Sequence, residues 1–271
     1  MNNFNGYLLV LDMDGTFLDD KRQVSAENLA AIKEWRSMGG EVCIASGRSA
    51  TGLLPLHKLL GCRLPIICGN GSGIYDPEKD EFLYSITLPE GGREIAEFAD
   101  RLLSETGITI YKDGKVWFCK ENNATHRNMT NEHLPHLTAD WRTLPYPWEK
   151  ILFSQEAEYT EAVHKLMHQV ADTSVFRLLK SAPVYYEVLN PLASKGQALR
   201  EYCRLYGYDL SKVVAVGDNE NDVSMLEIAV YSFTVANCTP AARAVAQRIV
   251  CDNNHSCARE VVDIMKNEFT K

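Results

Sequence analysis

The run Leu8-Leu9-Val10-Leu11-Asp12-Met13-Asp14-Gly15-Thr16 lies almost at the start of the chain and carries its strongest signal. A strand that is buried on both faces has continuous aliphatic sequence, so the carboxylates that follow it lie at its carboxyl end. Open α/β sheets bind their ligands at that edge. Alternation points Asp12 and Asp14 to the same side, and Gly15 allows a tight turn beside them. Because adjacent carboxylates repel unless a cation lies between them, the run predicts chemistry with Mg²⁺.

Composition limits the class of protein. The 271 residues are 45% hydrophobic and 24% charged, enough for one large or two modest globular domains with a substantial core. The formal charge of −8 argues against a nucleic-acid partner, so a phosphorylated substrate has to be captured locally. We find no pattern of a signal peptide or of a membrane span. The eight cysteines form no CxxC pair, which is typical of reduced thiols in a cytoplasmic protein. The oligomeric state is not indicated.

Two parts of the chain have the pattern of parallel α/β structure. In the first part, Ser25 caps a predicted helix that has Leu29, Ile32 and Trp35 on one face. Two apolar strands follow, and a second set of alternating helices and strands begins near Lys195. The expected strands after the first are 41–45, 65–68, 213–216 and 232–235. We expect the two parts to form one parallel sheet with right-handed crossovers.

Between these parts the pattern changes to hairpins and amphipathic helices. Asp113-Gly114 between two alternating runs predicts a hairpin, and the segments 174–180 and 184–188 predict another. The division expected is therefore a first core part over 1–81, an inserted α+β domain over 82–185 and a second core part over 186–271. The segment 121–147 is rich in Asn, His and Pro, and its structure cannot be assigned.

Four motifs occur in the order of a known superfamily. They are Asp12-x-Asp14-Gly15-Thr16, Ser46-Gly47-Arg48, Lys195-Gly196 and Gly217-Asp218-x-x-Asn221-Asp222. The chain resembles the haloacid dehalogenase-like superfamily of phosphohydrolases, and within it the Cof-type phosphatases, because the inserted domain lies between the second and third motifs. The resemblance covers nearly the full length. It implies a Rossmann-like α/β core with an inserted α+β cap, and a Mg²⁺-dependent phosphatase acting on small phosphorylated metabolites such as sugar phosphates.

The resemblance also implies roles for the charged residues. Asp12 resembles the nucleophile that forms an aspartyl-phosphate, and Asp14 resembles the general acid and base. The dehalogenating branch of the superfamily lacks the second aspartate, so Asp14 favours phosphate esters. Lys195 would neutralise charge on Asp12 and on the phosphoryl group. Asp218 would bind Mg²⁺ together with the Asp12 carboxylate and the Asp14 backbone carbonyl.

Further polar residues are implied to contact the substrate. Ser46 resembles a hydroxyl donor to the phosphate, the Gly47 amide a second donor, and Arg48 a group that reaches the substrate or the cap. Asn221 would bind near the phosphate, and Asp222 would orient Lys195 or metal-bound water. Taken alone, Ser-Gly-Arg is a common loop tripeptide and a lysine at a helix start is ordinarily solvated. A functional role for these residues is favoured only because all four motifs occur together in this order.

Two rival functions stay open. A phosphotransferase such as a hexose-phosphate mutase uses the same intermediate, and a catalytically silent binding protein could use the same scaffold. Weaker candidate residues are better explained without a ligand. His126, His133 and His136 do not have zinc spacing. Trp117, Trp141 and Trp148 could line a pocket, but core positions are the more common outcome.

Overall fold

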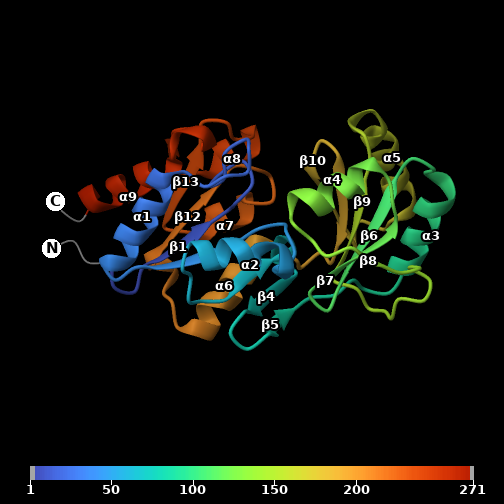
Figure 1. The fold of residues 1–271 in the computed structure, drawn as a ribbon, viewed down its shortest axis with the longest axis horizontal. Coiled ribbons are helices and arrows are strands. Elements are labelled where there is room, and N and C mark those ends of the chain that lie inside the picture. Colours follow the sequence, from blue (N-terminus) through green and yellow to red (C-terminus); the bar gives the residue numbers. More distant parts are fainter. Residues whose placement is uncertain (1–3, 269–271) are drawn as a thin grey trace.

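The structure is a computed structural model that describes residues 4–268, and it consists of two bodies that lie side by side (Figure 1). The early and late parts of the chain form one body, which we call the core. The middle of the chain forms the other, which we call the cap. Within residues 4–268, no helix is both long enough and apolar enough to cross a membrane.

A five-stranded parallel sheet forms the centre of the core, in the order β14-β13-β12-β1-β2. Its strands are β1 (Leu8–Leu11), β2 (Glu41–Ile44), β12 (Val213–Gly217), β13 (Tyr231–Val235) and β14 (Arg248–Val250). Strand β1 pairs in parallel with β2 on one side and with β12 on the other. The expectation that the two ends of the chain build one parallel sheet is therefore confirmed.

Helices cover both faces of this sheet. They are α1 (Ala26–Ser37), α2 (Ala50–Leu59), α6 (Lys195–Tyr206), α7 (Val223–Ile228), α8 (Pro240–Val245) and α9 (Cys257–Glu268). Leu9 and Leu11 pack in a cluster with α1, α2 and α9, whereas Leu8 and Val10 pack in a cluster with α6, α7 and α8. Because successive side chains of a strand point to opposite faces, this two-sided cover explains why β1 is apolar at every position.

The third predicted strand lies differently from the expectation. Strands β3 (Ile66–Cys68), β4 (Gly73–Asp76) and β5 (Glu81–Ser85) form a separate antiparallel sheet, which meets the parallel sheet through one bridge between Ala45 and Ile67. That bridge is parallel, as predicted, but the parallel pairing stops there and β3 makes its strand ladder with β4. Gly69 and Gly71 both have positive φ, so the chain reverses directly after β3 and pairs with its own continuation.

The cap is built on a six-stranded sheet in the order β10-β11-β9-β6-β7-β8. Its strands are β6 (Gly107–Lys112), β7 (Lys115–Lys120), β8 (Leu137–Thr138), β9 (Lys150–Ser154), β10 (Arg177–Ala182) and β11 (Tyr185–Leu189). Both predicted hairpins are present, and Asp113 and Gly114 turn the first with φ of 51° and 73°. The helices are α3 (Gly92–Leu102), α4 (Asn123–Asn131) and α5 (Thr160–Val170), so the unassigned segment 121–147 contributes one helix and one short strand. Short 3₁₀ turns occur at Gly69–Gly71, Ala157–Tyr159, Leu210–Lys212 and Asn253–His255.

The sheets place two strands across the predicted domain boundaries. Strand β5 pairs with β4 of the core, and β11 pairs with β9 of the cap. The chain therefore passes from core to cap after β5 and returns to the core after β11, a few residues beyond the predicted positions 81/82 and 185/186. Trp141 and Trp148 are buried in the hydrophobic centre of the cap, and Trp117 packs against it. The interpretation as core residues is confirmed for Trp141 and Trp148, whereas Trp117 lies partly buried at the edge of this centre.

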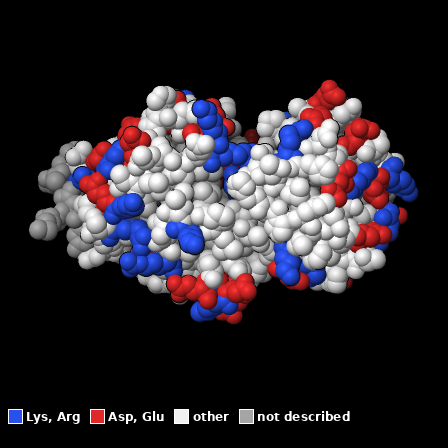
Figure 2. Space-filling model, viewed as in Figure 1, with Lys and Arg blue, Asp and Glu red and all other residues white. Residues whose placement is uncertain are grey.

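Charged side chains are dispersed over the molecule. Figure 2 shows acidic and basic residues intermixed on the visible face, with basic side chains beside the hollow where the two bodies meet. Lys and Arg side chains also gather on the lower left part of the core in this view.

Candidate active site

Three aspartates from two loops meet at the carboxyl edge of the parallel sheet. Asp12 follows β1, and Asp218 and Asp222 follow β12, the strand beside it. One carboxylate oxygen of each lies within 4.8 Å of the others. Paired parallel strands end at the same edge, so the positions of these residues follow directly from the pairing of β1 with β12.

Lys195 provides the positive charge for this cluster. It is fully buried at the first position of α6, and its Nζ lies 2.5 Å from Asp12 Oδ1 and 2.5 Å from Asp222 Oδ1. Burial acts to lower the pKa of Lys195, but the two carboxylates outweigh it and raise the pKa above its usual value. The ammonium therefore stays charged and bridges the two loops.

Asp222 also shapes the loop that carries Asp218. Its Oδ2 accepts hydrogen bonds from the backbone N–H groups of Asp218 at 2.9 Å and of Asn219 at 3.0 Å, while its other oxygen binds Lys195. A Cβ at Gly217 would lie 2.5 Å from the Asp222 carboxyl carbon. Only a glycine at position 217 leaves room for the Asp222 carboxylate to reach the backbone N–H groups of its own loop.

The turn after β1 holds Asp218 from the other side. Thr16 Oγ1 donates a hydrogen bond of 2.7 Å to Asp218 Oδ1, and a Cβ at Gly15, where φ is +79°, would lie 2.7 Å from Asp218 Oδ2. Burial, with Asp222 nearby, raises the pKa of Asp218 to about 6. Burial also raises the pKa of Asp12, and Asp222 adds to that effect. This cluster carries more negative charge than Lys195 balances, so a divalent cation with oxygen ligands fits it.

Asp14 lines the same cavity as Asp12, but its carboxylate is paired with arginines. Its carboxylate accepts two hydrogen bonds from Arg48, at 2.7 Å from Nε and 2.5 Å from Nη2, and Arg22 Nη1 lies 3.8 Å away. Burial acts to raise the pKa of Asp14, but Arg48 outweighs it and holds the pKa below its usual value. Arg48 thus contacts the predicted acid and base group, an arrangement that its tripeptide does not reveal.

The remaining predicted substrate-binding residues lie on two loops that touch. Ser46 Oγ accepts a hydrogen bond of 3.2 Å from the Arg48 backbone N–H. Asn221 Nδ2 donates to Asn70 Oδ1 at 2.9 Å, while Asn221 Oδ1 is buried and has no hydrogen-bond partner among residues 4–268. A Cβ at Gly47 would lie 2.9 Å from Asn70 Oδ1. Asn70 therefore joins the loop after β2 to the loop after β12.

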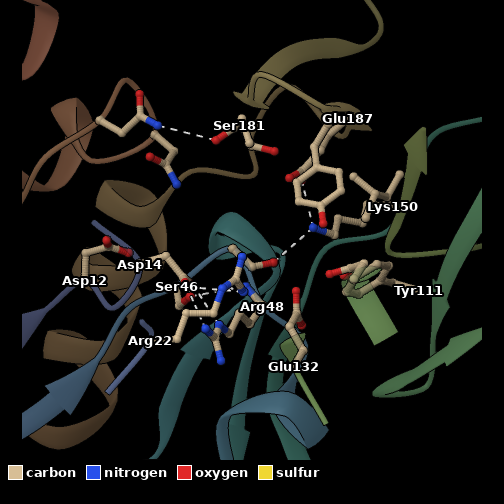
Figure 3. A pocket seen from close by; sticks show the side chains of 17 residues that line it. Asp12, Asp14, Arg22, Ser46, Arg48, Tyr111, Glu132, Lys150, Ser181 and Glu187 are labelled. Carbon is tan, nitrogen blue, oxygen red and sulfur yellow. Dashed lines mark hydrogen bonds and ion pairs between the residues drawn. The ribbon is translucent and has the colours of Figure 1, made fainter. Parts of the chain in front are cut away.

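A cavity of about 140 Å³ lies between core and cap, and Asp12, Asp14, Ser46 and Arg48 line its core side (Figure 3). The cap side includes residues that sequence analysis missed: Tyr111, Asn128, Glu132, Lys150, Ser181, Tyr185 and Glu187. One signal was available. Lys150 and Glu187 are charged residues within otherwise apolar or aromatic strands, which is unusual unless the charges are paired.

The weaker candidates lie away from this cavity. His126 and His136 are exposed on the cap, where both Nε2 atoms lie within hydrogen-bond distance of Glu121 Oε2, at 2.7 Å and 2.9 Å. His133 is also exposed. These positions agree with the interpretation of all three as surface histidines.

The sequence pattern of the haloacid dehalogenase-like hydrolases matches residues 9–260 of this chain. The chain belongs to this family. The expected family membership and the α/β fold class are thereby confirmed. Two similar proteins are named phosphatases. Phosphatase YwpJ of Bacillus subtilis is 28% identical and aligned over 91% of this chain and 95% of its own length. The 5-amino-6-(5-phospho-D-ribitylamino)uracil phosphatase YbjI of Escherichia coli is 25% identical and aligned over 96% of this chain and 97% of its own length. The same fold occurs in a haloacid dehalogenase-like hydrolase from Bacteroides thetaiotaomicron, with a TM-score of 0.83 at 22% identity over 96% of this chain and 99% of that one.

Proposed function

We propose that this protein is a Mg²⁺-dependent phosphatase that hydrolyses small phosphorylated metabolites, sugar phosphates or similar monoesters, through an aspartyl-phosphate on Asp12. The observation that carries the proposal is the contact of 2.5 Å between Lys195 Nζ and Asp12 Oδ1 beside Asp218 and Asp222. A buried carboxylate paired with an ammonium at the ligand-binding edge of the sheet suits attack on phosphorus. Relatives named as phosphatases along nearly the whole chain support the same reaction class.

The donor set supports Mg²⁺ as the cofactor. The Asp12 and Asp218 carboxylates and the Asp14 backbone carbonyl would hold the ion, with Thr16 fixing the Asp218 carboxylate. All are hard oxygen donors. Burial, and after it the charge of Asp222, raises the pKa values of Asp12 and Asp218, and a cation would stabilise the charged form of both carboxylates. The ion would supply charge neutralisation for the phosphoryl group.

The residues around the cluster can carry out hydrolysis in two steps. Asp12 forms a bond to phosphorus while the bond from phosphorus to the leaving oxygen breaks. Asp14 gives that oxygen a proton, for which its carboxylate must first leave Arg48 and take up a proton from solvent, because the ion pair keeps its pKa low. Asp14 then takes a proton from water, the water oxygen bonds to phosphorus, and the bond to Asp12 breaks to release inorganic phosphate. Lys195 stabilises the negative charge on the reacting groups throughout. Ser46, the Gly47 amide, Arg48 and Asn221 are the proposed contacts of the phosphate.

A phosphate-release screen with Asp12→Asn tests this function. The wild-type protein should release phosphate from several monoesters with Mg²⁺ and lose that activity with EDTA. Asp12→Asn should lower turnover more than about a thousandfold, because the nucleophile is gone. Asp172→Asn, at an exposed aspartate of the cap, is the matched control and should retain activity. Activity that persists in Asp12→Asn, or that ignores EDTA, would contradict the proposal, and a phosphate moved to another position of the substrate without release would favour a mutase.

A further inference from the structure

We propose that Lys150 of the cap is a positioning residue. It fixes the core loop that carries Ser46 and Gly47, so that binding of the phosphoryl group depends on the cap. This inference rests on the proposed phosphatase function. It assigns a role to a residue outside the four motifs, in the part of the chain that would otherwise be expected to contact only the organic part of the substrate.

The first observation is an ion pair buried where the two bodies meet. Lys150 opens β9 and Glu187 lies within β11, strands that pair in the cap sheet. Lys150 Nζ lies 2.8 Å from Glu187 Oε2, and the two side chains are 1% and 4% exposed. Burying two charges costs desolvation free energy that their attraction does not reliably repay, so such a pair calls for further contacts that use the charges.

Those contacts lead into the core. Lys150 Nζ donates a hydrogen bond of 3.0 Å to the Gly47 carbonyl oxygen, and Figure 3 shows the amino group of Lys150 pointing from the cap toward the loop that carries Ser46. The ammonium also lies 4.2 Å from the centre of the Tyr111 ring. Lys150 is thus fully engaged by protein groups, which leaves it poorly placed to bind the substrate itself.

The Gly47 carbonyl belongs to the loop proposed to bind phosphate. Fixing that carbonyl holds the peptide plane that it shares with the Arg48 N–H. This plane is joined through the Gly47 Cα to the plane of the Gly47 N–H, so the rotation of Gly47 next to Ser46 is restricted. The Gly47 backbone also packs closely against Asn70, since a Cβ there would lie 2.9 Å from Asn70 Oδ1. The contact from Lys150 therefore holds the donors in the arrangement that a phosphate requires.

The acidic partner extends the same contact to the second loop. Asn70 Nδ2 donates to Glu187 Oε2 at 2.9 Å, and Asn221 Nδ2 donates to Asn70 Oδ1 at 2.9 Å. Asn70 is fully buried and has a φ of 58°, a conformation that asparagine tolerates better than most residues. The cap ion pair is in this way connected to both loops proposed to contact phosphate.

Inhibition by inorganic phosphate provides the test, because phosphate has no organic part. With Mg²⁺ present, Lys150→Met should weaken inhibition by inorganic phosphate about tenfold, because ordering the loop that Lys150 no longer holds then costs part of the binding free energy. The kcat/KM of different monoesters should fall by a common factor, with their ranking unchanged. Lys180→Met, at an exposed lysine of the same cap sheet, should leave the inhibition constant unaltered.

A paired variant guards against loss of folding. Lys150→Met leaves Glu187 as an uncompensated buried charge, whereas Lys150→Met with Glu187→Gln removes both charges and keeps their volume. This double variant should fold and still bind phosphate about tenfold more weakly than the wild-type protein. An unchanged inhibition constant in the folded paired variant, or losses that differ between monoesters, would overturn the inference. Failure of the wild-type protein to release phosphate would instead contradict the proposed function.

Discussion

Lys195 is fully buried between Asp12 and Asp222, so the charge of each depends on the others. The ammonium balances the excess of negative charge in the cluster only in part, since Asp218 lies within the same few ångströms. Removing a single member therefore changes stability as well as chemistry. The direction of the change depends on whether the variant leaves charge without a partner.

Lys195→Met should destabilise the protein strongly. Loss of the ammonium leaves two buried carboxylates facing each other, and breaking a buried pair in this way costs about 3–5 kcal/mol. Adding Asp222→Asn should recover part of the loss, because one of the two uncompensated charges is then gone. Urea unfolding in EDTA measures both free energies of unfolding. A double variant less stable than Lys195→Met would show that the charges do not determine the loss.

The residue types of the site could be predicted, but their partners could not. Asp12, Asp14, Lys195 and Asp218 were identified from four motifs, and the structure brings Asp12, Lys195 and Asp218 together. The pairing of Asp14 with Arg48 depends on how the loop after β2 folds back over the first loop. No local pattern encodes such a contact between loops.

At the scale of elements, the turn after β3 sets the position of α6. A Cβ at Gly71, where φ is +89°, would lie 2.1 Å from the Ser194 carbonyl oxygen and 2.8 Å from the Lys195 backbone nitrogen. The close approach of this turn places the first residue of α6 against the core sheet. The glycine pattern of 69–73 was visible in the sequence, but its contact with a helix more than a hundred residues later was not, and the same turn sends β3 into its antiparallel sheet.

Gly71→Ala should be far more damaging than Gly207→Ala. Both glycines have positive φ, +89° and +70°, so alanine at either position carries backbone strain of about 1–2 kcal/mol. At Gly207 no atom of the described residues lies within 4 Å of the added Cβ, whereas at Gly71 the backbone of α6 must move. We expect Gly207→Ala to lower only thermal stability, and Gly71→Ala to lower phosphatase activity as well by displacing Lys195. Equal phosphatase activity in the two variants would show that the turn at Gly71 does not control the position of Lys195.

At the scale of the whole molecule, buried polar groups lie between core and cap outside the active-site cavity as well as around it. Glu149, directly before β9, lies beside a second, smaller cavity whose walls include Ser49, Cys68 and Ser72 of the core and Tyr111 of the cap. Its Oε1 accepts a hydrogen bond of 2.9 Å from the Asp113 backbone N–H, while its Oε2 is buried and has no hydrogen-bond partner in the part of the chain that the structure describes. The sequence predicted that a cap exists, because the hairpin patterns are local. The contacts of the cap with the core arise only from tertiary packing.

Glu149 should make the stability of the wild-type protein fall as the pH rises. Burial raises the pKa of Glu149 to about 7 from a usual value of 4.5. The folded state therefore holds a proton that the unfolded state releases, so the stabilising contribution is complete below about pH 4.5 and is lost as the pH rises through about 7. Glu149→Gln removes this titration. At pH 8 the variant should be more stable than the wild type by up to about 3 kcal/mol, and at pH 5 the two should be similar.

Urea unfolding of both proteins between pH 5 and pH 8 isolates the contribution of Glu149, because the other titrating groups are shared and cancel in the difference. Glu97→Gln, at an exposed glutamate on α3, changes the net charge by the same amount and should show no comparable trend. A difference between wild type and Glu149→Gln that stays constant with pH would mean that the carboxyl group reaches solvent. If the difference grows with pH as expected and phosphatase activity in the variant is unchanged, the carboxyl group costs stability where cap and core meet without taking part in the reaction.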